Sequence, residues 1–252
     1  MQGRFSPERR FAEFYRLYIA DFRHDVPLYL DLAGKSSGLV LEVGCRTGRV
    51  AAHLAAAGHA VHAIDLSRPM LEVAIEHLRP WSGHAQVYDF DLRAQALGQR
   101  FPLALVTLHS FNRLIDIEEQ RLFLRHLRGS LTSPGRVALD LFCPLSMIRP
   151  EAANEWRSIE RTVGGRRLQV RDRREMLTPL LERRTQVFWM DDKPCEEVVT
   201  HRRYVPPGQM RELLAEAGFE RARGLVDYDP STLAPLGGEG GPRGPYLALA
   251  EV

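Results

Sequence analysis

A short apolar run followed by two closely spaced glycines constrains this chain most strongly. Residues 39–44 form a strand of the kind that is buried on both faces of a parallel sheet. Gly44 and Gly48 bracket a turn, and Thr47 can cap the helix predicted over residues 47–57. Glycine permits a tight turn and close approach to a ligand, and free N–H groups at a helix start attract polar groups. This unit therefore predicts a ligand site.

The next predicted strand, residues 60–65, ends in an acidic residue, Asp65. In a βαβ nucleotide site, a carboxylate in this position accepts hydrogen bonds from ribose hydroxyls. Asp65 could instead cap the following helix, which is predicted over residues 68–79. Ser67 is the better cap candidate. We therefore expect the Asp65 carboxylate to face a ligand.

Strands and helices continue to alternate along the chain. Further strands are predicted over residues 85–90, 103–109, 136–142, 222–227 and 246–251, with helices over 116–131 and 207–217 and a short turn near 93–97. Ser133-Pro134-Gly135 is expected to form a turn before the fifth strand, and the last two strands a closing hairpin. The pattern predicts a Rossmann-like, doubly wound α/β fold with a mostly parallel, seven-stranded sheet.

An aromatic helix is predicted near the start of the chain, with Ser6 as its cap and Pro7 at its first position. Aromatic side chains recur in it at helical spacing, at Phe11, Phe14, Tyr15 and Tyr18. They either pack onto the core or form a lid over a ligand, and the sequence leaves both interpretations open for Tyr15 and Tyr18. A second short helix is expected over residues 25–34.

The pattern changes beyond residue 150. Long strands separated by turns are predicted over residues 155–163, 166–176, 181–190 and 195–204. Alternate residues of the third strand share one face, namely Leu181, Arg183, Thr185, Val187 and Trp189. We therefore expect N-terminal helices and an α/β core in residues 1–150, an inserted antiparallel meander in 151–205, and a final helix and hairpin in 206–252.

The first motif, Glu42-x-Gly44 with Gly48 after it, and the acid at Asp65 resemble the class I S-adenosyl-L-methionine (SAM) dependent methyltransferase family. The resemblance covers most of the chain and implies SAM as the cofactor. It implies that Glu42 supports the methionine end, that Gly44, Cys45 and Gly48 form the cofactor turn, and that Asp65 binds the ribose. The inserted strands would then cover the acceptor.

The resemblance also assigns residues around the adenine. Leu66 and Met70 would be its apolar walls, although Met70 as a plain core residue is nearly as plausible. Asp91 and Leu92 would lie at the adenine amino group, with Asp89 as the alternative acid. Tyr18 on the aromatic helix would contact the cofactor as part of a lid.

One residue departs from the family pattern. Arg46 stands where the family normally has its middle glycine. If φ at this position is positive, Arg46 strains the turn. Its side chain either narrows the pocket or swings out and leaves the backbone amides in place.

His109 is the candidate catalytic residue. SAM carries an activated methyl group, so the enzyme must mainly align the acceptor and exclude water, and a base is needed only where the acceptor must lose a proton. His109 follows the fourth strand, whose carboxyl end should meet the active site. As a base it would give an apparent pKa of roughly 6–7. A histidine here could also contact the cofactor, and His201 and Tyr204 are weaker candidates.

Composition limits the partners. The net charge is +2 and the arginines are scattered, which disfavours nucleic-acid binding. The sequence contains no apolar run long enough to suggest a membrane span. The cysteines are Cys45, Cys143 and Cys195; they are far apart, so no metal or disulfide is expected. We expect a cytoplasmic monomer or homodimer.

The leading hypothesis is a SAM-dependent methyltransferase that modifies N or O of a small-molecule acceptor. One alternative is a SAM-fold binding protein without methyl transfer, which Arg46 motivates. A nucleic-acid methyltransferase is disfavoured, because residues 109–112 read His-Ser-Phe-Asn where base-modifying members carry an Asn-Pro-Pro-Tyr type motif.

Overall fold

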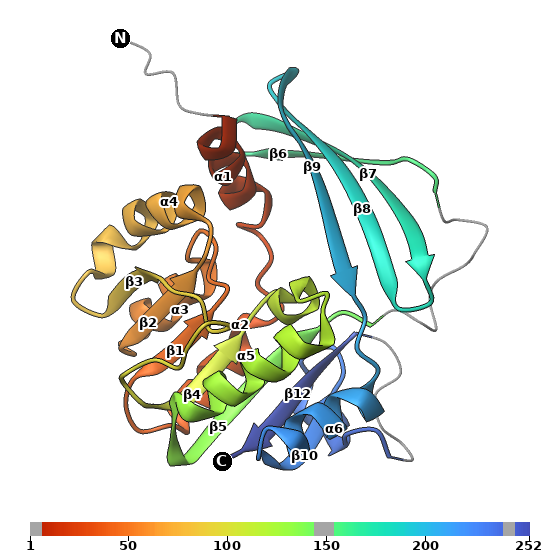
Figure 1. The fold of residues 1–252 in the computed structure, drawn as a ribbon. Coiled ribbons are helices and arrows are strands. Elements are labelled where there is room, and N and C mark those ends of the chain that lie inside the picture. The colour runs from red at the N-terminus through yellow and green to blue at the C-terminus, as the bar shows by residue number, and fades with distance from the viewer. Residues whose placement is uncertain (1–6, 144–153, 239–244) are drawn as a thin grey trace.

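The computed structural model describes residues 7–143, 154–238 and 245–252 (Figure 1). Its main sheet has the strand order β11-β10-β12-β5-β4-β1-β2-β3, and a second sheet has the order β6-β7-β8-β9. The main sheet contains β1 (Val40–Val43), β2 (Val61–Asp65), β3 (Ala85–Asp89), β4 (Phe101–Val106), β5 (Leu131–Leu141), β10 (Glu220–Leu225), β11 (Ala234–Pro235) and β12 (Tyr246–Glu251). The second sheet contains β6 (Arg157–Val163), β7 (Arg166–Thr178), β8 (Leu181–Met190) and β9 (Lys193–Arg203). The α-helices are α1 (Pro7–Tyr18), α2 (Val26–Gly34), α3 (Arg49–Ala56), α4 (Arg68–Leu78), α5 (Ile117–Gly129) and α6 (Pro207–Glu216).

The main sheet is mostly parallel, as predicted. β1 pairs in parallel with β2 and β4, and β3 and β5 extend the sheet in parallel on the two sides. β12 lies antiparallel between β5 and β10. The sheet has one strand more than predicted, because the two residues of β11 pair with β10. The predicted fold class is confirmed.

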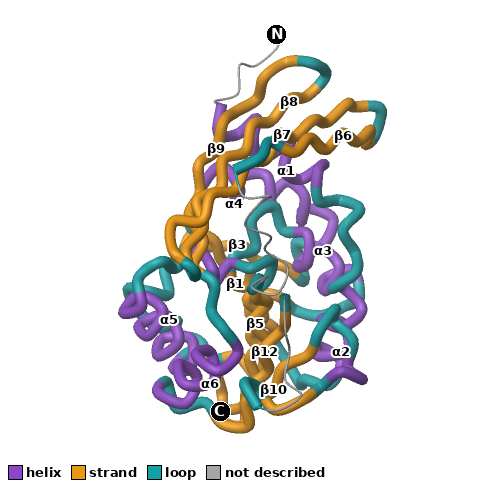
Figure 2. Tube along the Cα trace, turned by 90° about the vertical axis from the view of Figure 1, so that its right-hand side faces the viewer, coloured by secondary structure: helices purple, strands orange, loops and turns teal. Residues whose placement is uncertain are grey.

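Helices cover both faces of this sheet (Figure 2). Leu41 faces a core cluster that includes Leu124 of α5 and Leu213 of α6. Its neighbour Val40 faces the opposite cluster, with Leu54 of α3. Because successive side chains of a strand point to opposite faces, a continuous apolar run such as β1 is what a sheet covered on both sides requires.

Two predicted caps are wrong in detail. Gly48, with φ +76°, is the N-cap of α3, and the Thr47 hydroxyl is buried without a hydrogen-bond partner among the described residues. Ser67 is the N-cap of α4, but its side chain makes no cap hydrogen bond. The Asp65 carboxylate accepts the N–H of the N-cap residue Ser67 at 2.9 Å, which is a bond to the segment before the helix and not a cap bond. Ser6, the predicted cap of α1, lies outside the described residues, as does the boundary expected at residue 150.

Two strand boundaries also differ from prediction. β5 begins at Leu131 rather than 136, so it includes the predicted turn at residues 133–135, and its pairing with β4 shifts register there. β4 ends at Val106 rather than 109, because Leu108 and His109 have positive φ values that leave the extended conformation. This early end turns residues 107–109 out of the sheet.

The second sheet is an antiparallel meander, as predicted, and α1 lies between it and the α/β layers (Figure 1). Phe14 of α1 packs with Val170 and Phe188 of the sheet in a separate core cluster. In the part of the chain that the structure describes, no helix has the length and hydropathy needed to cross a membrane.

Candidate functional site

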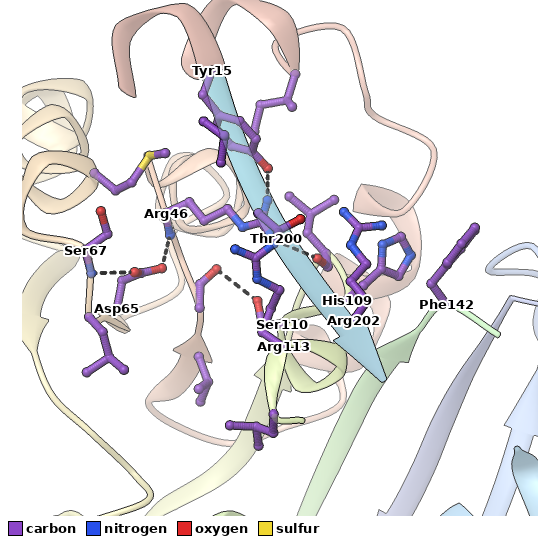
Figure 3. A pocket seen from close by; sticks show the side chains of 18 of the residues that line it. Tyr15, Arg46, Asp65, Ser67, His109, Ser110, Arg113, Phe142, Thr200 and Arg202 are labelled. Atoms are coloured by element: carbon purple, nitrogen blue, oxygen red, sulfur yellow. Dashed lines mark hydrogen bonds between the residues drawn. The ribbon is translucent and has the colours of Figure 1, made fainter. Parts of the chain in front are cut away.

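A cavity of about 810 Å³ lies where the main sheet, α1 and the second sheet meet (Figure 3). Its walls come from the ends of β1 and β2, the segments after β3 and β4, the inner side of α1, and one face of the second sheet. The parallel strands thus present their carboxyl ends to the cavity, which is where open α/β sheets bind ligands. The volume suits a cofactor together with a small second ligand.

The turn after β1 forms part of the cavity wall at Gly44 and Arg46. Arg46 has φ +52°, so it adopts the left-handed conformation that glycine normally supplies. Its side chain swings out: Nη2 donates to the Leu108 carbonyl at 3.1 Å, and Nη1 donates to the Tyr15 hydroxyl. Arg46 therefore combines the expected backbone strain with a side chain that joins α1 to the segment after β4.

We expect Gly44→Ala to destabilise the protein more than Gly58→Ala. Both glycines have positive φ, +74° and +89°, so both alanines introduce the same kind of backbone strain. A Cβ on Gly44 would lie 2.1 Å from Ser110 Oγ, whereas a Cβ on Gly58 meets nothing within 4 Å. Because of this overlap, Gly44→Ala should lower the free energy of unfolding by about 1–3 kcal/mol more than Gly58→Ala does. Urea denaturation of both variants measures the difference. Equal losses would show that Ser110 moves aside freely.

Asp65 lies on the cavity wall at the end of β2. One carboxylate oxygen accepts the Arg46 N–H at 2.9 Å, and the other accepts the Ser67 N–H at 2.9 Å. These bonds fix the carboxylate between the turn and α4, as Figure 3 shows. A carboxylate oxygen can accept more than one hydrogen bond, so both oxygens keep acceptor capacity for a ligand.

Three residues predicted to bind the cofactor do not line the cavity: Glu42, Cys45 and Gly48. Glu42 is buried behind the turn, where it accepts the Thr107 hydroxyl at 3.0 Å. Burial raises the pKa of Glu42 to about 7. Its other oxygen, Oε2, has no partner among the described residues. Cys45 is buried, which raises the pKa of its thiol, and Gly48 is packed against Leu78.

The residues predicted to surround the adenine do line the cavity. Leu66 is half exposed there, while Met70 and Leu92 are buried apolar wall residues. Asp91 also lines it, but Asp89 does not. The Arg93 guanidinium holds the Asp91 carboxylate, with Nη2 2.8 Å from Oδ2, and these hydrogen bonds lower the pKa of Asp91. The assignment of these residues to adenine remains a prediction.

α1 presents its aromatic side chains to both the core and the cavity. Phe14 is fully buried in the cluster with Phe188, whereas Tyr15 and Tyr18 line the cavity. The Arg161 guanidinium lies 5.2 Å from the Tyr18 ring centroid. Tyr18 thus lines the cavity, and its contact with the cofactor as part of a lid remains a prediction.

His109 lines the cavity and has φ +59°. Its Nε2 lies 3.4 Å from Oδ1 of the buried Asp140, whose other oxygen accepts the Tyr228 hydroxyl at 3.0 Å. Burial, followed by the charges of Arg202, Arg46 and Arg184, lowers the pKa of His109 to about 3. This value lies below the predicted 6–7, because burial and then the nearby arginines disfavour a positive charge on the imidazole ring. His201 does not line the cavity, and neither does Tyr204, which is buried.

Sequence reasoning missed the part of the site that the second sheet provides. Arg184, Gln186 and Phe188 line the cavity. The alternate residues from Leu181 to Trp189, which the sequence grouped on one face, therefore lie on the opposite face of β8. On β9, Val198, Thr200 and Arg202 line it at the same spacing of two residues. This spacing of two residues was the signal in the sequence that could have grouped these cavity-lining side chains. It groups the side chains by face but does not say which face meets the cavity.

The described residues contain no group of histidine, cysteine, aspartate or glutamate side chains that could hold a metal ion. The cavity wall carries acidic, apolar and basic side chains. These are a carboxylate at the end of β2, apolar walls beside it, and a histidine with several arginines at the other side.

Comparison with known proteins agrees with this architecture. Residues 41–137 match the family model described as a methyltransferase domain. Residues 41–137 are therefore similar to a methyltransferase domain, which agrees with the resemblance inferred from the sequence.

A curated relative, an uncharacterized methyltransferase from Alkaliphilus oremlandii (strain OhILAs), is 25% identical over 135 residues. The match spans 54% of this chain and 58% of that protein, so it covers little more than half of the relative.

Two solved structures share the fold over nearly the whole chain. A SAM-dependent methyltransferase from Clostridium acetobutylicum ATCC 824 has a TM-score of 0.78 at 15% identity, covering 96% of this chain and 97% of that one. A SAM-bound amino pentose methyltransferase from Micromonospora echinaspora, involved in calicheamicin biosynthesis, has a TM-score of 0.72 at 18% identity, covering 100% and 98%. At these identities the likeness concerns the fold.

Proposed function

We propose that this protein binds SAM in the cavity and transfers its methyl group to N or O of a small-molecule acceptor. The observation that carries the proposal is the position of Asp65, fixed by two backbone N–H groups on a cavity wall at the carboxyl edge of the parallel sheet. The apolar side chains of Leu66, Met70 and Leu92 beside it suit a flat adenine ring.

The chain's own residues would hold this cofactor in a defined way. Asp65 would accept the ribose hydroxyls, and the apolar walls with Asp91 would hold the adenine. Glu42 lies behind the turn, so it would act on the methionine end through the turn or through water entering beside its unpartnered Oε2. SAM supplies the methyl group as an activated sulfonium substituent.

The remainder of the cavity would receive the acceptor. α1 and the second sheet would form a lid over it, with Tyr15 and Tyr18 on the side of the cofactor. Such an enclosure excludes water and aligns the acceptor with the methyl group. The amino pentose methyltransferase that shares the fold over the whole chain supports a small polar acceptor with an amine or hydroxyl group.

His109 would act at the acceptor as a general base or as a hydrogen-bond acceptor that orients it. It is neutral above about pH 5, since burial and neighbouring arginines lower its pKa to about 3. A neutral imidazole can accept a proton from a hydroxyl or ammonium group without first losing one.

The test of cofactor binding is Asp65→Asn. We expect SAM to bind the parent protein and to bind the variant about 10-fold or more weakly, because a charge-assisted acceptor is lost. The affinity is measured by isothermal titration calorimetry with SAM and with S-adenosylhomocysteine. Asp89→Asn is the matched control, since Asp89 lies outside the cavity wall and should bind SAM like the parent.

The outcomes of this titration separate the alternatives. No heat and no thermal shift with millimolar SAM would overturn the proposal. SAM binding without methyl transfer to any small acceptor in a screen with labelled SAM would favour a SAM-fold binding protein. Methyl transfer to oligonucleotides would favour the nucleic-acid alternative.

A further inference from the structure

Four guanidinium groups gather around one end of the cavity. They come from distant parts of the chain: Arg46 in the turn after β1, Arg113 in a short 3-10 helix (Ser110–Arg113), Arg184 on β8 and Arg202 on β9. Figure 3 shows Arg46, Arg113 and Arg202 around the same space as His109. Arg46, Arg113 and Arg184 lie close enough to Arg202 for their charges to lower its pKa.

Carboxylates do not neutralise most of this charge. Among the described residues, no carboxylate oxygen lies within 4.0 Å of a guanidinium nitrogen of Arg46, Arg113 or Arg202, while Arg184 pairs with Asp172 at 2.5 Å. Arg46 donates to two neutral oxygens, those of Tyr15 and Leu108. These three guanidinium groups therefore lack ion-pair partners of their own, although Asp65 attracts Arg113 and Glu182 attracts Arg202 through space.

Two buried polar atoms on the same strand face are without a partner. The hydroxyl of Thr200 and Nε of Arg202 have no hydrogen-bond partner among the described residues. Both residues line the cavity, and they are two positions apart on β9, so their side chains share a face. A buried donor without an acceptor costs free energy, which a ligand with acceptor oxygens would recover.

The positive charges of these arginines also repel one another. Burial, followed by Arg184, lowers the pKa of Arg202 to about 9, and burial, followed by Arg46, lowers the pKa of Arg113 to about 10. Like charges held together in a cavity need a compensating anion. Guanidinium groups are suited to this, because their fork of N–H donors matches the oxygens of carboxylate and phosphate groups.

Resting on the proposed function, we propose that the methyl acceptor carries an oxyanion, a carboxylate or phosphate group, which Arg113, Arg202 and Thr200 bind at this end of the cavity. Arg184, paired with Asp172, adds a guanidinium to the same wall. Thr200 and Arg202 belong to the second sheet, whereas Asp65 and the glycine turn belong to the main sheet. Arg113 follows β4 of the main sheet. Because two of the three anion ligands come from the second sheet, the proposal assigns the anion to the acceptor rather than to the cofactor.

The oxyanion also explains how a histidine with a low pKa could serve as base. A bound negative charge beside Arg202 and Arg46 would offset the charges that lower the pKa of His109. The acceptor would then raise the basicity of His109 as it binds, through electrostatic attraction alone.

Arg202→Gln and Arg113→Gln test the proposal, with Arg183→Gln as matched control. Arg183 is adjacent to Arg184 on β8 but points to the other face, where it pairs with Glu175 at 3.7 Å. The probes are sodium phosphate, sodium pyrophosphate and sodium succinate, each compared with sodium chloride at equal ionic strength. Thermal unfolding and calorimetry are measured without SAM, so the result does not depend on cofactor binding.

We expect phosphate, pyrophosphate or succinate to stabilise the parent and Arg183→Gln beyond the effect of chloride. Binding should be about 10- to 100-fold weaker in Arg202→Gln and Arg113→Gln, as for the loss of a charge-assisted contact. Stabilisation by the phosphate probes alone identifies a phosphate site, and stabilisation by succinate alone identifies a carboxylate site. Without any anion the two variants should unfold no earlier than the parent, because each removes an uncompensated charge.

SAM affinity, measured in the same variants, separates the acceptor from the cofactor. Unchanged SAM binding in Arg202→Gln and Arg113→Gln supports an acceptor site. A parallel 10-fold loss of SAM affinity would assign the arginines to the cofactor carboxylate and overturn the proposal, as would equal stabilisation of the parent by every salt. If SAM fails to bind while phosphate or succinate does, the proposed function fails and the anion site stands.

Discussion

Replacing His109 by alanine is expected to lower the rate of methyl transfer by about 10²–10⁴-fold while SAM affinity changes little. The reason is its proposed role: His109 sits on the cavity wall beside the arginines and would receive the proton that the acceptor loses. Single-turnover rates with labelled SAM give the chemical step, and calorimetry gives the affinity. His201→Ala is the control, because His201 lies outside the cavity and should keep the parent rate.

His109→Gln distinguishes a base from an orienting group. Glutamine can still accept a hydrogen bond but cannot take up a proton at neutral pH. A rate as low as that of the alanine variant supports the base. A rate near that of the parent would instead favour catalysis by alignment, and a proportional loss of SAM affinity and rate would make His109 a cofactor contact.

The pH dependence of the rate should reflect Asp140 rather than His109. Burial raises the pKa of Asp140 to about 7, so this acid is protonated below that pH and becomes a carboxylate above it. The carboxylate, 3.4 Å from His109 Nε2, would then favour protonation of the imidazole and make it a better base. The rate should therefore rise as the pH increases through about 7.

Asp140→Asn should remove this rise, because asparagine stays neutral. In kcat/KM, which reports the free enzyme, His109 itself should cause no inflection between pH 5 and 8, since its pKa without ligand is lowered to about 3. An inflection near pH 6–7 that persists in Asp140→Asn would restore the titration of His109 that the sequence predicted.

Asp25→Asn is expected to reduce the free energy of unfolding by about 3–5 kcal/mol, the usual effect of removing one partner of a buried ion pair. The Asp25 carboxylate is fully buried and receives both terminal nitrogens of Arg49, at 2.8 and 2.5 Å. Arg49 begins α3, directly after the glycine turn, and Asp25 precedes α2. The variant leaves the Arg49 cation buried without its main partner.

Asp31→Asn is the matched control for this measurement. It makes the same chemical change in the exposed pair of Asp31 and Lys35, which lie 2.6 Å apart on α2. Such pairs contribute about 0–1 kcal/mol. Chemical denaturation of both variants gives the comparison, and a loss below about 1 kcal/mol in Asp25→Asn would show that nearby acids compensate Arg49.

Local patterns in the sequence were enough for the fold and for part of the cavity wall at the main sheet. The apolar run of β1, the glycines after it and the acid at the end of β2 are each readable within a few residues. Because carboxyl ends of parallel strands meet at one edge, this information places Gly44, Asp65 and His109 near the same cavity without coordinates. Short-range steric and hydrogen-bonding rules decide these features.

Finer local details depended on competing interactions. Gly48 rather than Thr47 became the cap of α3, and the Ser67 side chain makes no cap hydrogen bond, while the Ser67 N–H donates to Asp65. β4 ended early where Leu108 and His109 turn to positive φ. In each case several neighbouring residues could have formed the cap or ended the strand, and the backbone conformation of the folded protein decided which of them did.

Only the tertiary structure decided which arginines gather at the cavity. Arg46, Arg113, Arg184 and Arg202 are far apart in the sequence, where they read as scattered surface charge. The strand period groups the side chains of β8 and β9 by face, but the packing of α1 against Phe188 selects the face that meets the cavity. The low pKa of His109 follows from burial and from charges on other elements. Electrostatic energies depend on distances through space, and the sequence fixes those distances only through the packed fold.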